Sequence, residues 1–199
     1  MKKVLLTITL GILIAGSAFA QMPDKPFSFY LSGGVSMPQS DLKDNYKMGF
    51  QGAAGLGLKL IPLIEAVGRV SYHSFEPDWG DEVDTEPDGG RFSALLYGVE
   101  GKVNLGQTGF TLFALAGAGG AKLDISDMEF ETGGGTQTVS FESETKSYFT
   151  IGAGLEFTRL FVEARYVKIL DNLDIDNIEL DIDEEQTIVF IPLSVGFKL

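Results

Sequence analysis

The chain has 199 residues, no cysteine and a formal net charge of −13 at pH 7. The lack of cysteine excludes a disulfide framework and thiol chemistry. The strong acidic balance argues against a nucleic-acid partner.

The N-terminus has the three parts of a secretory signal peptide. Lys2 and Lys3 are followed by an apolar run of about 12 residues, Val4–Ala15, and by the small-residue cleavage pattern Ala18–Ala20. The run is too short for a membrane-spanning helix, which needs about 20 residues. We therefore expect residues 1–20 to be removed on export and residues 21–199 to form one domain.

After residue 20, the hydrophobic pattern has a period of two, which is typical of β-strands. In the last strand, for example, Val189, Ile191 and Leu193 share one face. Eight strands are predicted, in chain order, over 27–37, 48–60, 63–75, 91–105, 110–122, 148–157, 160–170 and 189–199.

The connections between these strands alternate between short turns and long loops. The long loops are Pro38–Lys47, Glu76–Gly90, Leu123–Thr145 and Asp171–Gln186, and most of the acidic residues lie in them. This alternation is typical of outer-membrane barrels, in which the short turns are periplasmic. The sequence thus predicts an all-β, eight-stranded, antiparallel, up-and-down transmembrane β-barrel with long acidic extracellular loops.

One face of the predicted strands carries charged residues between apolar neighbours. In a narrow lumen each charge would need a partner, because an unpaired buried charge is costly. The set contains four acids and four bases, a balance that favours a lumen ion-pair network. A soluble periplasmic ligand-binding barrel, with its apolar face inside, remains an alternative. The predicted network consists of Lys59, Glu65, Arg69, Glu100, Lys102, Glu156, Glu163 and Arg165.

Basic residues mark the outer ends of the strands. They are Lys47, Arg91, Lys122, Lys146 and Lys168. In the barrel they would form a rim at the level of the lipopolysaccharide phosphates, for which basic side chains are suitable partners. The alternative is that they pair with nearby loop acids.

Aromatic residues cluster near the predicted strand ends, as in the two interfacial girdles of membrane barrels. The outer group is less regular, because Phe75, Phe92 and Tyr148 share the charged face unless a bulge re-aims them. The periplasmic group is Phe27, Phe29, Phe110, Phe157, Phe161 and Phe197, and the outer group is Phe75, Phe92, Tyr148 and Phe149.

The third and fourth long loops keep the alternating pattern. We expect each to form a hairpin that extends the barrel wall outward and offers an exposed edge to a protein partner. Clustered acids of the fourth loop, such as Asp174 and Asp176, also raise the possibility of calcium binding, but the EF-hand spacing is missing. We therefore predict no metal site and no cofactor.

The single histidine, His73, is the one candidate for a catalytic base. Ser71 lies two residues away on the same strand face, and Ser74 follows directly, so a lipid hydrolase or acyltransferase is conceivable. No acid can be placed beside His73 from the sequence. We therefore interpret His73 as a polar lumen residue and predict no enzymatic activity.

The mature chain resembles the family of small outer-membrane barrels that includes OmpX and the opacity-type proteins. The resemblance rests on Gly33–Pro38 leading to Tyr46–Phe50, on Phe161–Tyr166 and on the closing strand Ile191–Leu199. It implies insertion into a Gram-negative outer membrane by the barrel-assembly machinery. Family members typically end in phenylalanine, whereas this chain ends in Leu199.

Together these patterns predict a structural or interaction protein of the cell outer membrane. It would stabilise the membrane, contact lipopolysaccharide and present acidic loops to a surface partner. We expect a monomer and no open pore, because side chains can fill an eight-stranded interior.

Overall fold

The computed structural model describes residues 26–79, 88–106, 110–132, 135–170 and 188–199. The predicted signal peptide lies outside these residues, as does the whole of the predicted fourth loop with its expected hairpin.

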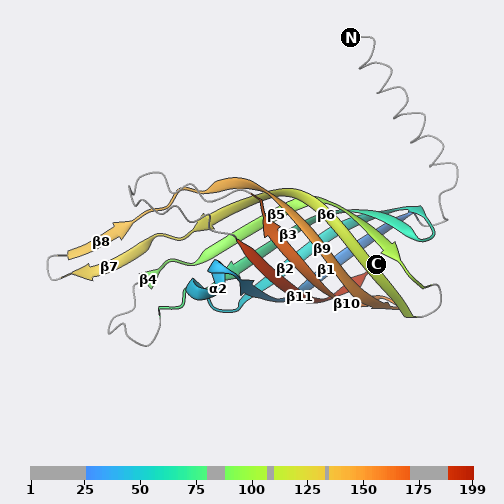
Figure 1. Ribbon diagram of the computed structural model, residues 1–199, viewed down its shortest axis with the longest axis horizontal. Coiled ribbons are helices and arrows are strands. Elements are labelled where there is room, and N and C mark those ends of the chain that lie inside the picture. Colours follow the sequence, from blue (N-terminus) through green and yellow to red (C-terminus); the bar gives the residue numbers. More distant parts are fainter. Residues whose placement is uncertain (1–25, 80–87, 107–109, 133–134, 171–187) are drawn as a thin grey trace, which may run out of the picture.

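Eight strands form a closed antiparallel barrel in the order β1-β11-β10-β9-β6-β5-β3-β2, as predicted from the sequence (Figure 1). Each strand pairs with its neighbours in the chain, and β1 pairs with β11 to close the barrel. Backbone hydrogen bonds between Phe29 and Leu199 extend this closing pair. The strands are β1 (Phe27–Gln39), β2 (Gly49–Ile61), β3 (Ile64–Phe75), β5 (Phe92–Asn104), β6 (Phe110–Ile125), β9 (Glu144–Phe157), β10 (Leu160–Ile169) and β11 (Val189–Lys198).

The two faces of each strand differ as the period-two pattern requires. On β10, Phe161, Glu163 and Arg165 are buried in the lumen, while Val162 and Ala164 between them are exposed. The same alternation runs around the barrel, so the outer surface is apolar and the charged side chains of the strands lie in the interior. This is the arrangement of a transmembrane barrel, and it argues against the soluble alternative, whose apolar face would be inside.

Smaller elements stand at the end of the barrel that carries the long loops, which we call the outer end. A short helix, α2 (Asp41–Asn45), was not predicted. The strands β4 (Asp88–Gly89), β7 (Met128–Thr132) and β8 (Gly135–Val139) form a second sheet in the order β4-β7-β8. It projects beyond the barrel at the left of Figure 1. The hairpin predicted in the third loop is therefore present. No helix among the described residues is long and apolar enough to cross a membrane.

Of the four residues predicted for the outer aromatic girdle, only Phe149 lies on the outward face, where its ring packs on Tyr166 at 6.2 Å. Phe75, Phe92 and Tyr148 are buried inside the barrel, as their parity indicated, and no bulge turns them outward. Phe161, predicted for the periplasmic girdle, is also buried. Other aromatic side chains are exposed on the outer half of the wall instead: Phe50, Tyr72, Tyr97 and Tyr166.

Candidate functional site

One cluster of lumen charges is a layer of two arginines and two glutamates, here called the arginine layer: Arg69, Glu100, Glu163 and Arg165. Arg69 Nη1 lies 2.8 Å from Glu163 Oε1, and Arg165 Nε lies 3.0 Å from the same oxygen. Arg165 also holds Glu100 through both terminal nitrogens. Ser194 donates a hydrogen bond of 3.1 Å to Glu163. Every charge therefore has an opposite partner, which buried ions require.

A second cluster, the lysine layer, lies nearer the end with the short turns. It contains Tyr30, Glu65, Lys102, Glu156 and Lys198. Lys102 Nζ is 2.7 Å from Glu156 Oε2, and Lys198 Nζ bridges Glu156 at 3.1 Å and Glu65 at 3.4 Å. The Tyr30 hydroxyl donates to Glu65 at 2.7 Å. This layer is also balanced, with two acids and two bases.

Seven of the eight residues predicted for the lumen network lie in these two layers, and Lys59 does not. Lys59 is only partly buried and forms no ion pair with a described residue. The pairing register of β2 and β3 shifts between Lys59 and Ile61, so strict alternation ends at this point. Lys198 takes the fourth basic position instead. Its parity with Ser194 on β11 was the signal that could have identified it.

The lysine layer needs a glycine on the neighbouring strand. A Cβ at Gly57 would overlap Glu65 Oε1 and press against the Tyr30 ring. Glycine on the lumen face of β2 therefore makes room for two large side chains of β1 and β3. The ammonium group of Lys102 lies 4.1 Å from the centre of the Phe113 ring, a cation–π contact that helps to hold it in this crowded space.

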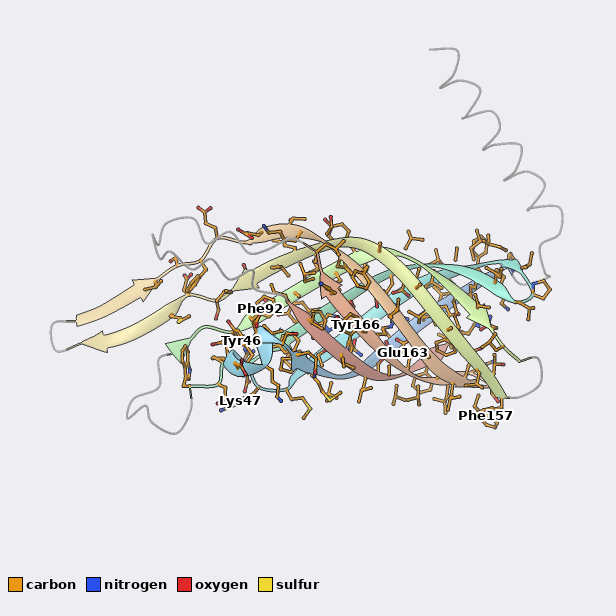
Figure 2. The ribbon with its side chains drawn as sticks, in the orientation of Figure 1. Tyr46, Lys47, Phe92, Phe157, Glu163 and Tyr166 are labelled. Carbon is orange, nitrogen blue, oxygen red and sulfur yellow. The ribbon has the colours of Figure 1, made fainter. Side chains whose placement is uncertain are left out.

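Apolar side chains fill the outer half of the lumen, in a cluster here called the apolar plug. The Phe75 ring lies 5.8 Å from Phe92 and 5.5 Å from Phe190. The ion pairs therefore lie in the inner half of the lumen, and the plug beside them was not predicted from the sequence. Figure 2 shows Phe92 toward the outer end and Glu163 deeper in the barrel. The plug consists of Leu42, Phe75, Phe92, Ala94, Leu96, Ala121, Leu123, Tyr148, Val167, Ile169, Ile188 and Phe190.

The helix α2 covers the plug at the outer end of the barrel. Leu42 inserts into the plug, and the Tyr46 ring packs on Phe92 at 5.6 Å. Backbone hydrogen bonds of 2.8 Å join Lys47 N to Glu76 O and Asp78 N to Asn45 O, so the first loop is tied to the second. Burial raises the pKa of the Tyr46 hydroxyl, which stays neutral against the ring of Phe92.

The five predicted rim bases differ in their surroundings. Lys47 lies 3.6 Å from Asp78, and Arg91 lies 3.1 Å from Glu76. Lys146 lies on the inward-facing line of β9, with its ammonium 3.3 Å from Glu144. Lys122 and Lys168 point outward from β6 and β10, and no described acid is within ion-pair distance of either. The loop-pairing alternative therefore applies to three of the five.

Comparison with solved structures supports the architecture. No protein-family model and no curated protein matches the sequence. Neisserial surface protein A is similar in structure, with a TM-score of 0.50 and 13% identity over 88% of this chain and 97% of that chain. The chain has the fold of a small outer-membrane β-barrel. Two further barrels are more distant: Ail of Yersinia pestis (TM-score 0.48, 19% identity, 87% and 97% covered) and the N-terminal domain of Pseudomonas aeruginosa OprF (0.44, 14%, 86% and 97%).

Within this outer-membrane barrel fold, His73 is buried against the plug. Its Nδ1 is 2.8 Å from Ser36 Oγ, its Nε2 is 3.0 Å from Ser71 Oγ, and its ring packs on Phe190 at 4.8 Å. Only 2% of His73 is exposed. A catalytic base must reach its substrate, and both ring nitrogens are already engaged here, so the geometry does not favour the hydrolase alternative.

The described residues contain no group of three or more side chains suited to hold a metal ion. The acids considered for calcium, Asp174 and Asp176, lie outside these residues.

Proposed function

We propose that this protein is a structural and interaction component of the Gram-negative outer membrane, in which a sealed barrel carries acidic loops at the cell surface. The observation that carries the proposal is the filled lumen. Two neutral ionic layers occupy the inner half and the apolar plug occupies the outer half, under α2. The apolar outer wall supports the membrane location, and the filling supports a role other than solute transport.

A bilayer recording tests the sealed lumen. The protein purified from outer membranes and inserted into planar bilayers should give no stepwise conductance, because an eight-stranded interior is filled by side chains. A porin of about 16 strands, inserted under the same conditions, provides the positive control. Reproducible discrete conductance steps from the purified protein would contradict the sealed lumen and, with it, the proposed structural role.

We further propose that Lys122 and Lys168 bind lipopolysaccharide phosphates. They combine an outward position with the lack of a described acidic partner. Each basic residue near an anionic surface contributes about 1 kcal/mol. The double variant Lys122→Gln/Lys168→Gln should therefore bind lipopolysaccharide roughly 30-fold more weakly. Quantifying the lipopolysaccharide that co-purifies with each variant measures the effect.

The matched control is the double variant Lys47→Gln/Arg91→Gln. It removes the same charge at the same end of the barrel, but from residues already paired with Asp78 and Glu76. We expect a smaller loss than for the first variant. Equal co-purification by wild type and both variants would end the lipopolysaccharide proposal and leave the rim bases as partners of loop acids.

The projecting sheet supports the proposed protein partner. In the described part of the chain, β8 pairs with β7 alone, so its other edge can accept a strand from another protein. Backbone pairing would provide the affinity and the neighbouring acids would select a basic partner.

For insertion into the membrane, Phe197 on the outward face of β11 is the candidate residue that the barrel-assembly machinery would recognise. We propose a monomer, with lipid around the whole barrel wall.

A further inference from the structure

A small cavity lies between the arginine layer and the apolar plug. Its volume is about 10 Å³, and Gln51, Arg69, Ser71 and Thr150 are among the residues that line it. Gln51 belongs to β2 and Thr150 to β9, which face each other across the barrel. A cavity needs roughly 10–15 Å³ by this measure to hold one water molecule. The space therefore suits a single water and excludes larger ligands.

Three of the residues that line this cavity each carry a buried polar atom that lacks a hydrogen-bond partner among the described residues. These atoms are Gln51 Nε2, Thr150 Oγ1 and Arg69 Nε. Gln51 is 6% exposed and Thr150 is 2% exposed, so bulk water does not solvate them. Arg69 Nε lies 3.4 Å from Glu100 Oε2, which is an ion-pair distance without a hydrogen bond. Buried polar groups are nearly always satisfied, by protein or by ordered water.

We propose that this cavity is a binding site for one structural water molecule. The water oxygen accepts hydrogen bonds from Gln51 Nε2 and Arg69 Nε, and one water proton is donated to Thr150 Oγ1. These three bonds match the number that buried waters usually make. One molecule in this position satisfies all three unpartnered atoms.

The charges around the cavity favour water over a small anion such as chloride. Two of the unpartnered groups are donors, which an anion could also use. However, Arg69 and Arg165 are already neutralised by Glu100 and Glu163. Glu100 itself lines the cavity, so an added anion would face a carboxylate in a site that is neutral without it. A neutral ligand avoids this cost.

The water also joins two polar groups that the protein keeps apart. On one side is the arginine layer. On the other side of the cavity is a hydrogen-bonded group in which His73 connects Ser36 and Ser71, at 2.8 Å and 3.0 Å. Ser71 lines the same cavity, so its hydroxyl is the natural acceptor for the second water proton. The site thus completes the polar interior up to the edge of the apolar plug.

A crystal structure of the wild-type protein in detergent, grown with bromide in place of chloride, tests the site. We expect one peak within hydrogen-bond distance of Gln51 Nε2 and Thr150 Oγ1, without an anomalous bromide signal. An anomalous peak would identify a halide site and overturn the proposal. An empty cavity at a resolution that shows other buried waters would overturn it as well.

Two variants provide a second test by magnetisation transfer from water in NMR spectra. Gln51→Leu and Thr150→Val each remove one polar partner at nearly constant volume, and each should abolish the transfer to amides around the cavity. The control Ser32→Ala removes a buried serine that does not line the cavity, and it should retain the signal. If neither variant folds, the wild-type crystal still decides. Transfer that persists in both folded variants would refute the site.

Discussion

Replacing Arg165 with methionine should lower the free energy of unfolding by about 3–5 kcal/mol, the usual cost of removing one partner from a buried ionic network. Arg165 is 7% exposed and holds both Glu100 and Glu163. Without it, Arg69 would be the only base facing two buried carboxylates. Urea unfolding of the barrel in lipid vesicles, followed by its migration on gels with and without heating, measures the loss.

Two controls separate the ionic effect from a general effect of substitution. Arg165→Lys keeps the charge but loses the double contact of the guanidinium, so we expect a smaller loss than for methionine. Arg159→Met removes a base from the exposed turn between β9 and β10 and should change stability by less than about 0.5 kcal/mol. Equal stability of the Arg165→Met and Arg159→Met variants would mean that the arginine layer does not stabilise the barrel.

Phe190→Ala should also cost about 3–5 kcal/mol, since it removes a fully buried ring from the apolar plug. Phe190 is 0% exposed and its ring packs on Phe75 and His73. The surrounding strands belong to a closed barrel and cannot collapse into the space, so a cavity remains. The same unfolding measurement in vesicles gives the free energy.

The matched control for this variant lies on the same strand. Phe197 also belongs to β11, but it points outward and is 55% exposed. In a bilayer, lipid chains can fill the space left by Phe197→Ala, so we expect a clearly smaller loss than for Phe190→Ala. A larger loss at Phe197 than at Phe190 would contradict the assignment of the two faces.

The barrel itself could be predicted from the sequence because two independent patterns agree. Period-two alternation fixes the strands, and the alternation of short and long connections fixes an up-and-down order. The main differences in strand bounds are at the outer end, where β9 begins at Glu144 and β6 continues to Ile125. In the β9 extension, Glu144–Ser147, both faces carry polar residues, so the hydrophobic pattern does not mark where that strand begins. In the β6 extension the alternation continues through Leu123 and Ile125 into the predicted loop.

The candidate site could be predicted only in part. Parity places a side chain in the lumen but does not choose its partner, so the division into an arginine layer and a lysine layer required the structure. Parity also assumes a regular strand, and the register shift beside Lys59 breaks that assumption. The apolar plug was missed for a different reason. The rule that membrane barrels have polar interiors describes an average, and Phe75 and Phe190 depart from it where α2 closes the outer end.

The pairing of charges across strands has a consequence for assembly. Hydrophobic alternation alone would tolerate a strand that slides by two residues, because the same faces still point inward. Such a slide would move Glu163 and Arg165 along the barrel axis and away from Arg69 and Glu100. The buried ions would then lose their partners of opposite charge. A slide by one residue would turn the side chains of Glu163 and Arg165 outward, into the hydrocarbon core of the membrane. The ionic layers therefore select one register of the strands among the several that the hydrophobic alternation alone would allow.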